Sequence, residues 1–150
     1  MTLHVGDPAP DFTANNQDGQ PISLHDFKGK KLVLYFYPKD DTPGCTAQAC
    51  DLRDNYERML AQGYAVVGVS VDDETSHQKF IKKFDLPFPL LADTDHKVVE
   101  AYGVWAEKKN YGRTYMGIVR TTFVIDEDGK IEDIINKVNT KEHAGQILNQ

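Results

Sequence analysis

Two cysteines, Cys45 and Cys50, are the residues of this sequence best suited to redox chemistry. Cys45 follows a Pro-Gly pair and opens a stretch without proline or glycine that ends before Gly63. Such a stretch predicts a helix over residues 45–62, with glycine as its C-terminal signal. The unpaired backbone N–H groups and the dipole of a helix start favour a thiolate over a thiol. The spacing therefore predicts a nucleophilic Cys45.

Three structural interpretations compete with a reactive thiol: a buried hydrophobe, half of a metal site, and a permanent disulfide. The position after Pro-Gly at a helix start disfavours buried filler. A zinc site needs closely spaced Cys or His ligands, whereas the histidines are scattered, at His4, His25, His77, His96 and His143. Helical positions five apart have Cα atoms roughly 8.5 Å apart, and a disulfide needs about 4.4–6.8 Å. Cys45 and Cys50 can therefore bond only if the start of the helix unwinds.

Two continuous apolar runs, residues 32–37 and 64–71, predict buried strands on either side of this helix. A strand, a helix and a second strand predict a parallel crossover. Residues 121–126 and 130–136 predict a hairpin around an Asp-Gly turn, and a final helix should begin at Asn139 or Thr140.

The remaining segments predict shorter elements. Two edge strands should flank the turn within residues 15–21, with one helical turn over 23–29. Residues 75–78 have the form of a capping box before a helix that runs to about Asp85. A short strand at 90–92 and a brief helix before Gly103 follow. Residues 105–117 read as a loop, either a solvated one with its aromatics tucked into the core or one that lines the substrate site.

This order of elements is that of an α/β thioredoxin-like fold, in which helices flank a central mixed sheet. The length of 150 residues predicts a single domain over residues 1–150. The C-terminal ends of parallel strands are where such folds bind ligands. Cys45 is expected just beyond one of them.

The motif around Cys45 carries a specific resemblance. Pro38, Thr42 and Cys45 stand in the Pro-x₃-Thr-x₂-Cys spacing of the peroxiredoxin active site. The longer pattern over residues 37–50, with the second cysteine five residues after the first, resembles the bacterioferritin comigratory protein, or Q-type, subfamily. Segments 103–105, 111–115 and 120–126 resemble it too, so the similarity covers nearly the whole chain. It implies the same thioredoxin-like fold with an N-terminal extension.

The resemblance also implies a role for each matching residue. Cys45 would be the nucleophile that a hydroperoxide oxidises to a sulfenic acid, and Cys50 would resolve it as an intramolecular disulfide. Arg120 would hold the thiolate and the peroxide, since a guanidinium is always charged; taken by itself, it reads as a surface cation. Thr42 would present its hydroxyl to the sulfur and the peroxide, or cap the helix. Pro38 would shield the sulfur, and the N–H groups of Gly44 and Cys45 would bind the peroxide.

Many peroxiredoxins carry a glutamate one turn after the nucleophile, whereas the Q-type pattern, like this chain, has a glutamine, Gln48. The expected partners are a hydroperoxide and thioredoxin or a similar dithiol reductant. We expect neither a cofactor nor a metal. The subfamily suggests a monomer.

The composition agrees with a cytoplasmic enzyme. A formal net charge of −6 argues against a nucleic-acid or anionic-membrane partner. No apolar run approaches the length of a membrane span, and no basic, then apolar leader is visible at the start. Two cysteines in such a chain suggest redox chemistry in a reducing compartment.

Two other functions stay open. A thioredoxin-type thiol–disulfide exchanger would usually show Cys-x-x-Cys, and a proline before the strand that Arg120 opens; the sequence has neither. A non-catalytic redox-sensing module would need a reactive thiol without turnover.

Overall fold

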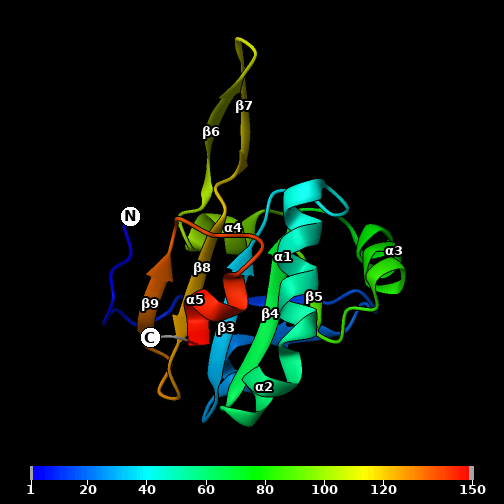
Figure 1. Ribbon diagram of the computed structural model, residues 1–150. Coiled ribbons are helices and arrows are strands. Elements are labelled where there is room, and N and C mark those ends of the chain that lie inside the picture. The colour runs from blue at the N-terminus through cyan, green and yellow to red at the C-terminus, as the bar shows by residue number, and fades with distance from the viewer. Residues whose placement is uncertain (1, 149–150) are drawn as a thin grey trace.

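A computed structural model describes residues 2–148, and a five-stranded mixed sheet forms its centre (Figure 1). The strand order is β5-β4-β3-β8-β9. Three strands run parallel, namely β3 (Lys31–Phe36), β4 (Tyr64–Ser70) and β5 (Leu90–Ala92). Two strands run antiparallel to their neighbours, β8 (Thr121–Ile125) and β9 (Ile131–Ile135). The predicted parallel pair and C-terminal hairpin are both confirmed.

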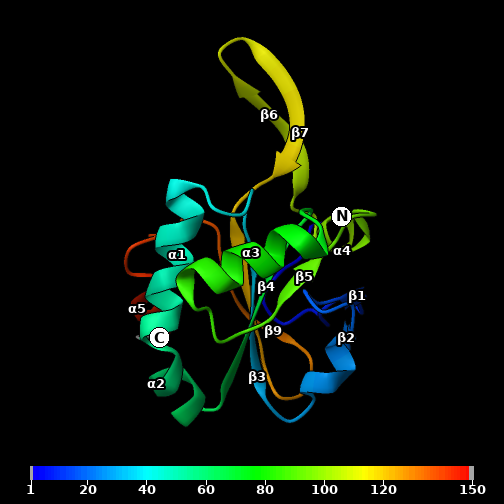
Figure 2. The same cartoon turned by 90° about the vertical axis from the view of Figure 1, so that its right-hand side faces the viewer.

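Helices and short strands cover both faces of the sheet (Figure 2). The first face carries α1 (Pro43–Asp54), α2 (Tyr56–Ala61), α3 (Glu74–Phe84) and α5 (His143–Leu148). The second carries the 3₁₀ turn η1 (Leu24–Phe27), α4 (Lys97–Ala101) and the antiparallel pair β1 (Thr13–Asn15) and β2 (Pro21–Ser23).

Residues of β3 alternate between two cores, which explains their continuous apolar run. Leu34 packs on the second face and Tyr35 on the first, and both are buried. Tyr35 lies across Gly68 of β4, where an added Cβ would stand 2.8 Å from the tyrosine Cζ. Glycine at position 68 is therefore needed for this ring to pack.

Three helix predictions need correction. The final helix, expected to begin at Asn139 or Thr140, begins at His143. The helix expected over residues 45–62 is broken at Asn55, because the Asn55 amide bonds the carbonyl of Asp51 at 2.8 Å and ends α1 there. The capping box at residues 75–78 does not form. Asp73 caps α3 instead, accepting a hydrogen bond of 2.8 Å from the Ser76 N–H, while Gln78 reaches the carbonyl of Gln17.

The segment expected to be a loop over residues 105–117 is an extended hairpin of β6 (Trp105–Asn110) and β7 (Arg113–Ile118). It projects from the body (Figure 1). Tyr111 and Gly112 form its tip with positive φ values of 51° and 76°, as tight hairpin turns require. Tyr111 and Tyr115 are exposed, so the expectation that the loop's aromatics lie in the core is wrong for both.

Within residues 2–148, no helix is both long and apolar enough to cross a membrane.

Candidate active site

Cys45 lies at the start of α1, as the sequence predicts. The helix begins at Pro43, which places the cysteine third in its first turn. The first helical hydrogen bond joins the Thr46 N–H to the Thr42 carbonyl at 2.8 Å. The N–H groups before it have no partner within the helix. Cys45 is 2% exposed, so its sulfur is shielded from bulk water.

Arg120 reaches this sulfur from 75 residues away in the sequence. Its Nη2 lies 3.4 Å from Cys45 Sγ. The sheet register explains the approach, because Phe36, the last residue of β3, pairs with Thr121, the first residue of β8. The end of one strand and the start of the other therefore meet at one edge of the sheet, with α1 above them.

Gly44 leaves space for the guanidinium. A Cβ at this position would stand 3.1 Å from Arg120 Nη2, which is tighter than ordinary van der Waals contact. The second residue of α1 is thus a glycine where a side chain would crowd the cation beside the sulfur.

Arg120 also holds Gln48, one turn along α1. Its Nη1 donates to Gln48 Oε1 at 2.6 Å, so one guanidinium bridges the amide and the thiol. Gln48 is fully buried, and within the described chain its Nε2 has no hydrogen-bond partner. The amide orients the arginine and leaves its charge unneutralised.

Thr42 and Pro38 lie in the loop that joins β3 to α1. The Thr42 hydroxyl donates to the carbonyl of Lys39 at 2.8 Å, which fixes the turn and leaves the oxygen able to accept a second bond. Thr42 is the N-cap residue of α1 by position, although its side chain makes no capping hydrogen bond. Pro38 is half-buried at the end of β3.

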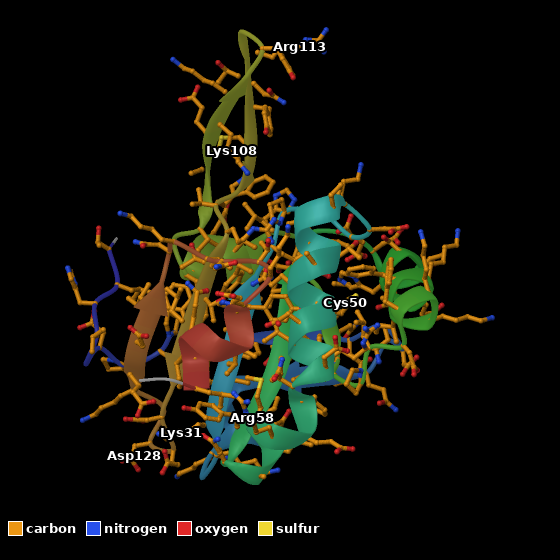
Figure 3. The ribbon with its side chains drawn as sticks, in the orientation of Figure 1. Lys31, Cys50, Arg58, Lys108, Arg113 and Asp128 are labelled. Atoms are coloured by element: carbon orange, nitrogen blue, oxygen red, sulfur yellow. The ribbon has the colours of Figure 1, made fainter. Side chains whose placement is uncertain are left out.

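Cys50 also lies on α1 (Figure 3), where it is half-buried. Both cysteines are free thiols. One continuous helix spans the two cysteines, which keeps their Cα atoms roughly 8.5 Å apart. Asp51, next to Cys50, accepts a 2.8 Å hydrogen bond from the Ala144 N–H of α5. Unwinding α1 as far as Cys50 would therefore strain the contact between these helices.

A second polar cluster, which the sequence analysis missed, lies behind the loop. Asp40, Asp72 and His77 place potential metal-ligand atoms within 4.8 Å of one another. Each of these side chains already makes hydrogen bonds inside the cluster. These bonds make it a network of hydrogen bonds rather than an open coordination site. Its residues come from three separate segments of the sequence, so no local motif marks it.

Known proteins resemble the chain over almost its full length. Residues 5–134 match the model of the AhpC/TSA family. Peroxiredoxin Bcp of Bacillus subtilis is 47% identical over 148 residues, covering 99% of this chain and 94% of the relative. The chain is a Bcp-type peroxiredoxin of the AhpC/TSA family.

Solved structures of this group have the same fold. A cysteine mutant of Xylella fastidiosa peroxiredoxin Q superposes with a TM-score of 0.93 at 31% identity, over 99% of this chain and 95% of that one. The bacterioferritin comigratory protein of Xanthomonas campestris gives a TM-score of 0.86 at 34% identity, over 92% of this chain and 88% of that one. That structure is described as giving insights into alkyl peroxide reduction from trapped intermediate and ligand complexes.

These similarities confirm the predicted fold and family. The peroxiredoxin is accordingly a thiol-dependent peroxidase, an oxidoreductase that uses a hydroperoxide and a thiol reductant.

Proposed function

We propose that this peroxiredoxin reduces hydroperoxides with Cys45 as the nucleophile and Cys50 as the resolving thiol. The observation that carries the proposal is the 3.4 Å approach of Arg120 Nη2 to Cys45 Sγ at the first turn of α1. A fixed positive charge and a helix start both favour the thiolate, which is the form that attacks an O–O bond.

In the first step the Cys45 thiolate attacks the terminal oxygen of the peroxide, and the O–O bond breaks. The sulfur is oxidised to a sulfenic acid, and the departing alkoxide or hydroxide takes a proton to leave as an alcohol or water. Arg120 and the N–H groups of Gly44 and Cys45 would stabilise the oxygen that gains charge. Thr42 would accept a hydrogen bond from the peroxide at the same place, since its own proton is donated to Lys39, and Pro38 would limit the access of water.

In the second step the Cys50 thiol attacks the sulfenic sulfur. A disulfide forms and the sulfenic oxygen leaves as water. Because α1 keeps the cysteines apart, this step requires its first turns to unwind. Two electrons from a dithiol reductant then restore both thiols, and we propose a thioredoxin or a similar protein for this role.

Further assignments rest on the same argument. The Xanthomonas relative supports alkyl hydroperoxides, besides hydrogen peroxide, as substrates. The cycle needs only thiols, so we propose that residues 1–150 act as one catalytic domain without a cofactor. Two cysteines that cycle between dithiol and disulfide fit a reducing compartment such as the cytoplasm, which we propose as the location. A monomer can contain the whole cycle.

A thioredoxin-type exchanger is disfavoured, because such proteins carry a proline before the strand that Arg120 opens. No proline occurs there in this sequence. A non-catalytic sensor would consume about one peroxide per molecule, and added reductant would not sustain further peroxide consumption.

The test is peroxide consumption coupled to thioredoxin and its reductase. Cys45→Ser should abolish consumption. Cys50→Ser should keep one rapid oxidation per molecule and lose thioredoxin-linked turnover. Appreciable turnover by Cys45→Ser would overturn the assignment of the nucleophile.

A further inference from the structure

A buried pair, Asp40 and His77, joins the active-site loop to α3. Asp40 precedes Cys45 by five residues and is 7% exposed, and His77 is fully buried. His77 Nδ1 lies 2.7 Å from Asp40 Oδ2, and Ser76 donates to the same oxygen at 2.8 Å. The Tyr37 hydroxyl donates to the other carboxylate oxygen.

The backbone of the loop is held at the same point. The Asp40 N–H donates to Asp72 Oδ2 at 2.9 Å, and Asp72 itself accepts from Ser70 at 2.6 Å. Asp40 thus ties the loop to the residues that follow β3 and β4 and to the first turn of α3. The loop continues through Thr42 into α1, so its position sets where that helix begins.

The partners of His77 fix its protons. Its Nε2 lies 2.8 Å from the carbonyl oxygen of Leu91, which can only accept, so Nε2 carries a hydrogen. Its Nδ1 faces a carboxylate oxygen that already accepts from Ser76. The hydroxyl groups of Tyr37 and Ser76 donate to its two oxygens, so Asp40 meets His77 as a hydrogen-bond acceptor. Both ring nitrogens of His77 then donate, and the pair consists of an imidazolium and a carboxylate.

The charges around the ring agree with this state. Asp40 comes from the loop, Asp72 from the turn after β4, and the Tyr37 phenol from the end of β3, while β5 contributes the Leu91 carbonyl. Burial lowers the pKa of His77, but the hydrogen bond and charge of Asp40, helped by Leu91 and Asp72, outweigh it and raise the pKa above its ordinary value. The phenol stays neutral, since burial and Asp40 raise the pKa of Tyr37 well above its ordinary value.

We propose that Asp40 and doubly protonated His77 are positioning residues that anchor the active-site loop, so that Thr42 and the start of α1 are held ready for peroxide. The anchor stays in place while α1 unwinds after Pro43, and returns the helix start to the same position in each cycle. Loss of the Nδ1 proton would leave the lone pairs of His77 Nδ1 and Asp40 Oδ2 facing each other, and their repulsion would release the loop. This inference rests on the proposed role of Cys45.

Two substitutions separate the two nitrogens of His77. The amide nitrogen of asparagine takes the place of Nδ1, so His77→Asn keeps the donor to Asp40 and removes its titration. The longer glutamine places its amide nitrogen near Nε2, so His77→Gln keeps the Leu91 bond and loses Asp40. Both bury one neutral amide. Lys83→Ala is the matched control, because Lys83 joins the same helix to the same loop through Asp41, in an exposed ion pair of 2.8 Å.

The measurement is the rate constant for Cys45 oxidation by hydrogen peroxide between pH 6 and 10 in the Cys50→Ser background. Each rate is divided by the thiolate fraction, read from absorbance near 240 nm. With His77 intact, the normalised rate constant should fall as the pH rises above the ordinary histidine range. The Lys83→Ala variant should give the same pH profile. His77→Asn should give a flat profile. His77→Gln should be about tenfold slower at every pH, as expected for a lost hydrogen bond to a buried charge.

A flat normalised profile with His77 intact would overturn the proposal, and this result requires no substitution that could fail to fold. Equal losses in His77→Asn and His77→Gln, in proportion to their unfolding free energies, would reduce His77 to a structural role. Failure of the proposed function would look different, because Cys45→Ser would then still consume peroxide.

Discussion

Replacement of Arg120 by alanine tests the electrostatic part of the mechanism. At 3.4 Å from the sulfur, two unit charges interact by about 5 kcal/mol at an effective dielectric of about 20, and by about 1 kcal/mol in bulk water. Arg120 is half-buried, which places its environment between these limits. Removal of one preorganised donor costs other enzymes a comparable amount. We therefore expect Arg120→Ala to lose about 2–4 kcal/mol of transition-state stabilisation, roughly 30- to 1000-fold in rate.

The assay is single-turnover oxidation by hydrogen peroxide in the Cys50→Ser background, which isolates the first step from resolution. The oxidation rate of Arg120→Lys should lie between those of the parent and of Arg120→Ala, because one ammonium cannot bridge Gln48 and Cys45 as the guanidinium does. Arg113→Ala removes an exposed cation on the projecting hairpin (Figure 3) and should leave the rate within about twofold. An Arg120→Ala rate within about threefold of the parent would refute the electrostatic role of Arg120.

Two further predictions concern crowding and pH. Gly44→Ala should slow the same oxidation step, because its Cβ would press on Arg120 Nη2 from 3.1 Å; a crystal structure of the variant should show the guanidinium displaced from the sulfur, and an unmoved guanidinium would count against this cause. His143 is neutral in the fold, since its Nδ1 bonds Gln146 Oε1 and its Nε2 faces the Thr122 hydroxyl, and burial lowers the pKa of His143. The unfolded chain then binds the extra proton, so the free energy of unfolding should fall as the pH drops below about 6.5. The pKa of His77 is shifted the opposite way, so its contribution to the free energy of unfolding stays complete below that pH. His143→Asn should therefore reduce the fall in the free energy of unfolding with decreasing pH, measured by urea unfolding. An unchanged pH dependence would reject His143 as its source.

The local pattern around Cys45 made its position at a helix start predictable from sequence. A buried strand, a Pro-Gly turn and a glycine-free stretch place Cys45 at a helix start, and the structure confirms that position. The approach of Arg120 was not predictable from spacing, because it depends on the antiparallel register that pairs Phe36 with Thr121. Without the family resemblance, Arg120 reads as a surface cation.

Two features could not be predicted from the sequence: the hairpin of residues 105–118 and the different surroundings of His77 and His143. The hairpin of residues 105–118 packs no face on the core along most of its length, so it lacks the alternation of apolar and polar residues that reveals a strand. Gly112 at its tip was the available signal. His77 and His143 look alike in sequence, yet one is surrounded by acceptors and the other by an acceptor and a hydroxyl donor. Only the tertiary structure shifts their pKa values in opposite directions.

We propose that Cys45 and Cys50 react with each other only after the start of α1 unwinds. Peptide-resolved hydrogen exchange tests it, comparing the reduced protein with protein treated with one equivalent of hydrogen peroxide. We expect the amides of residues 46–54 to be protected in the reduced protein, and this protection to be lost once a Cys45–Cys50 disulfide has formed. Equal protection of this segment in both forms, with the disulfide present, would contradict it.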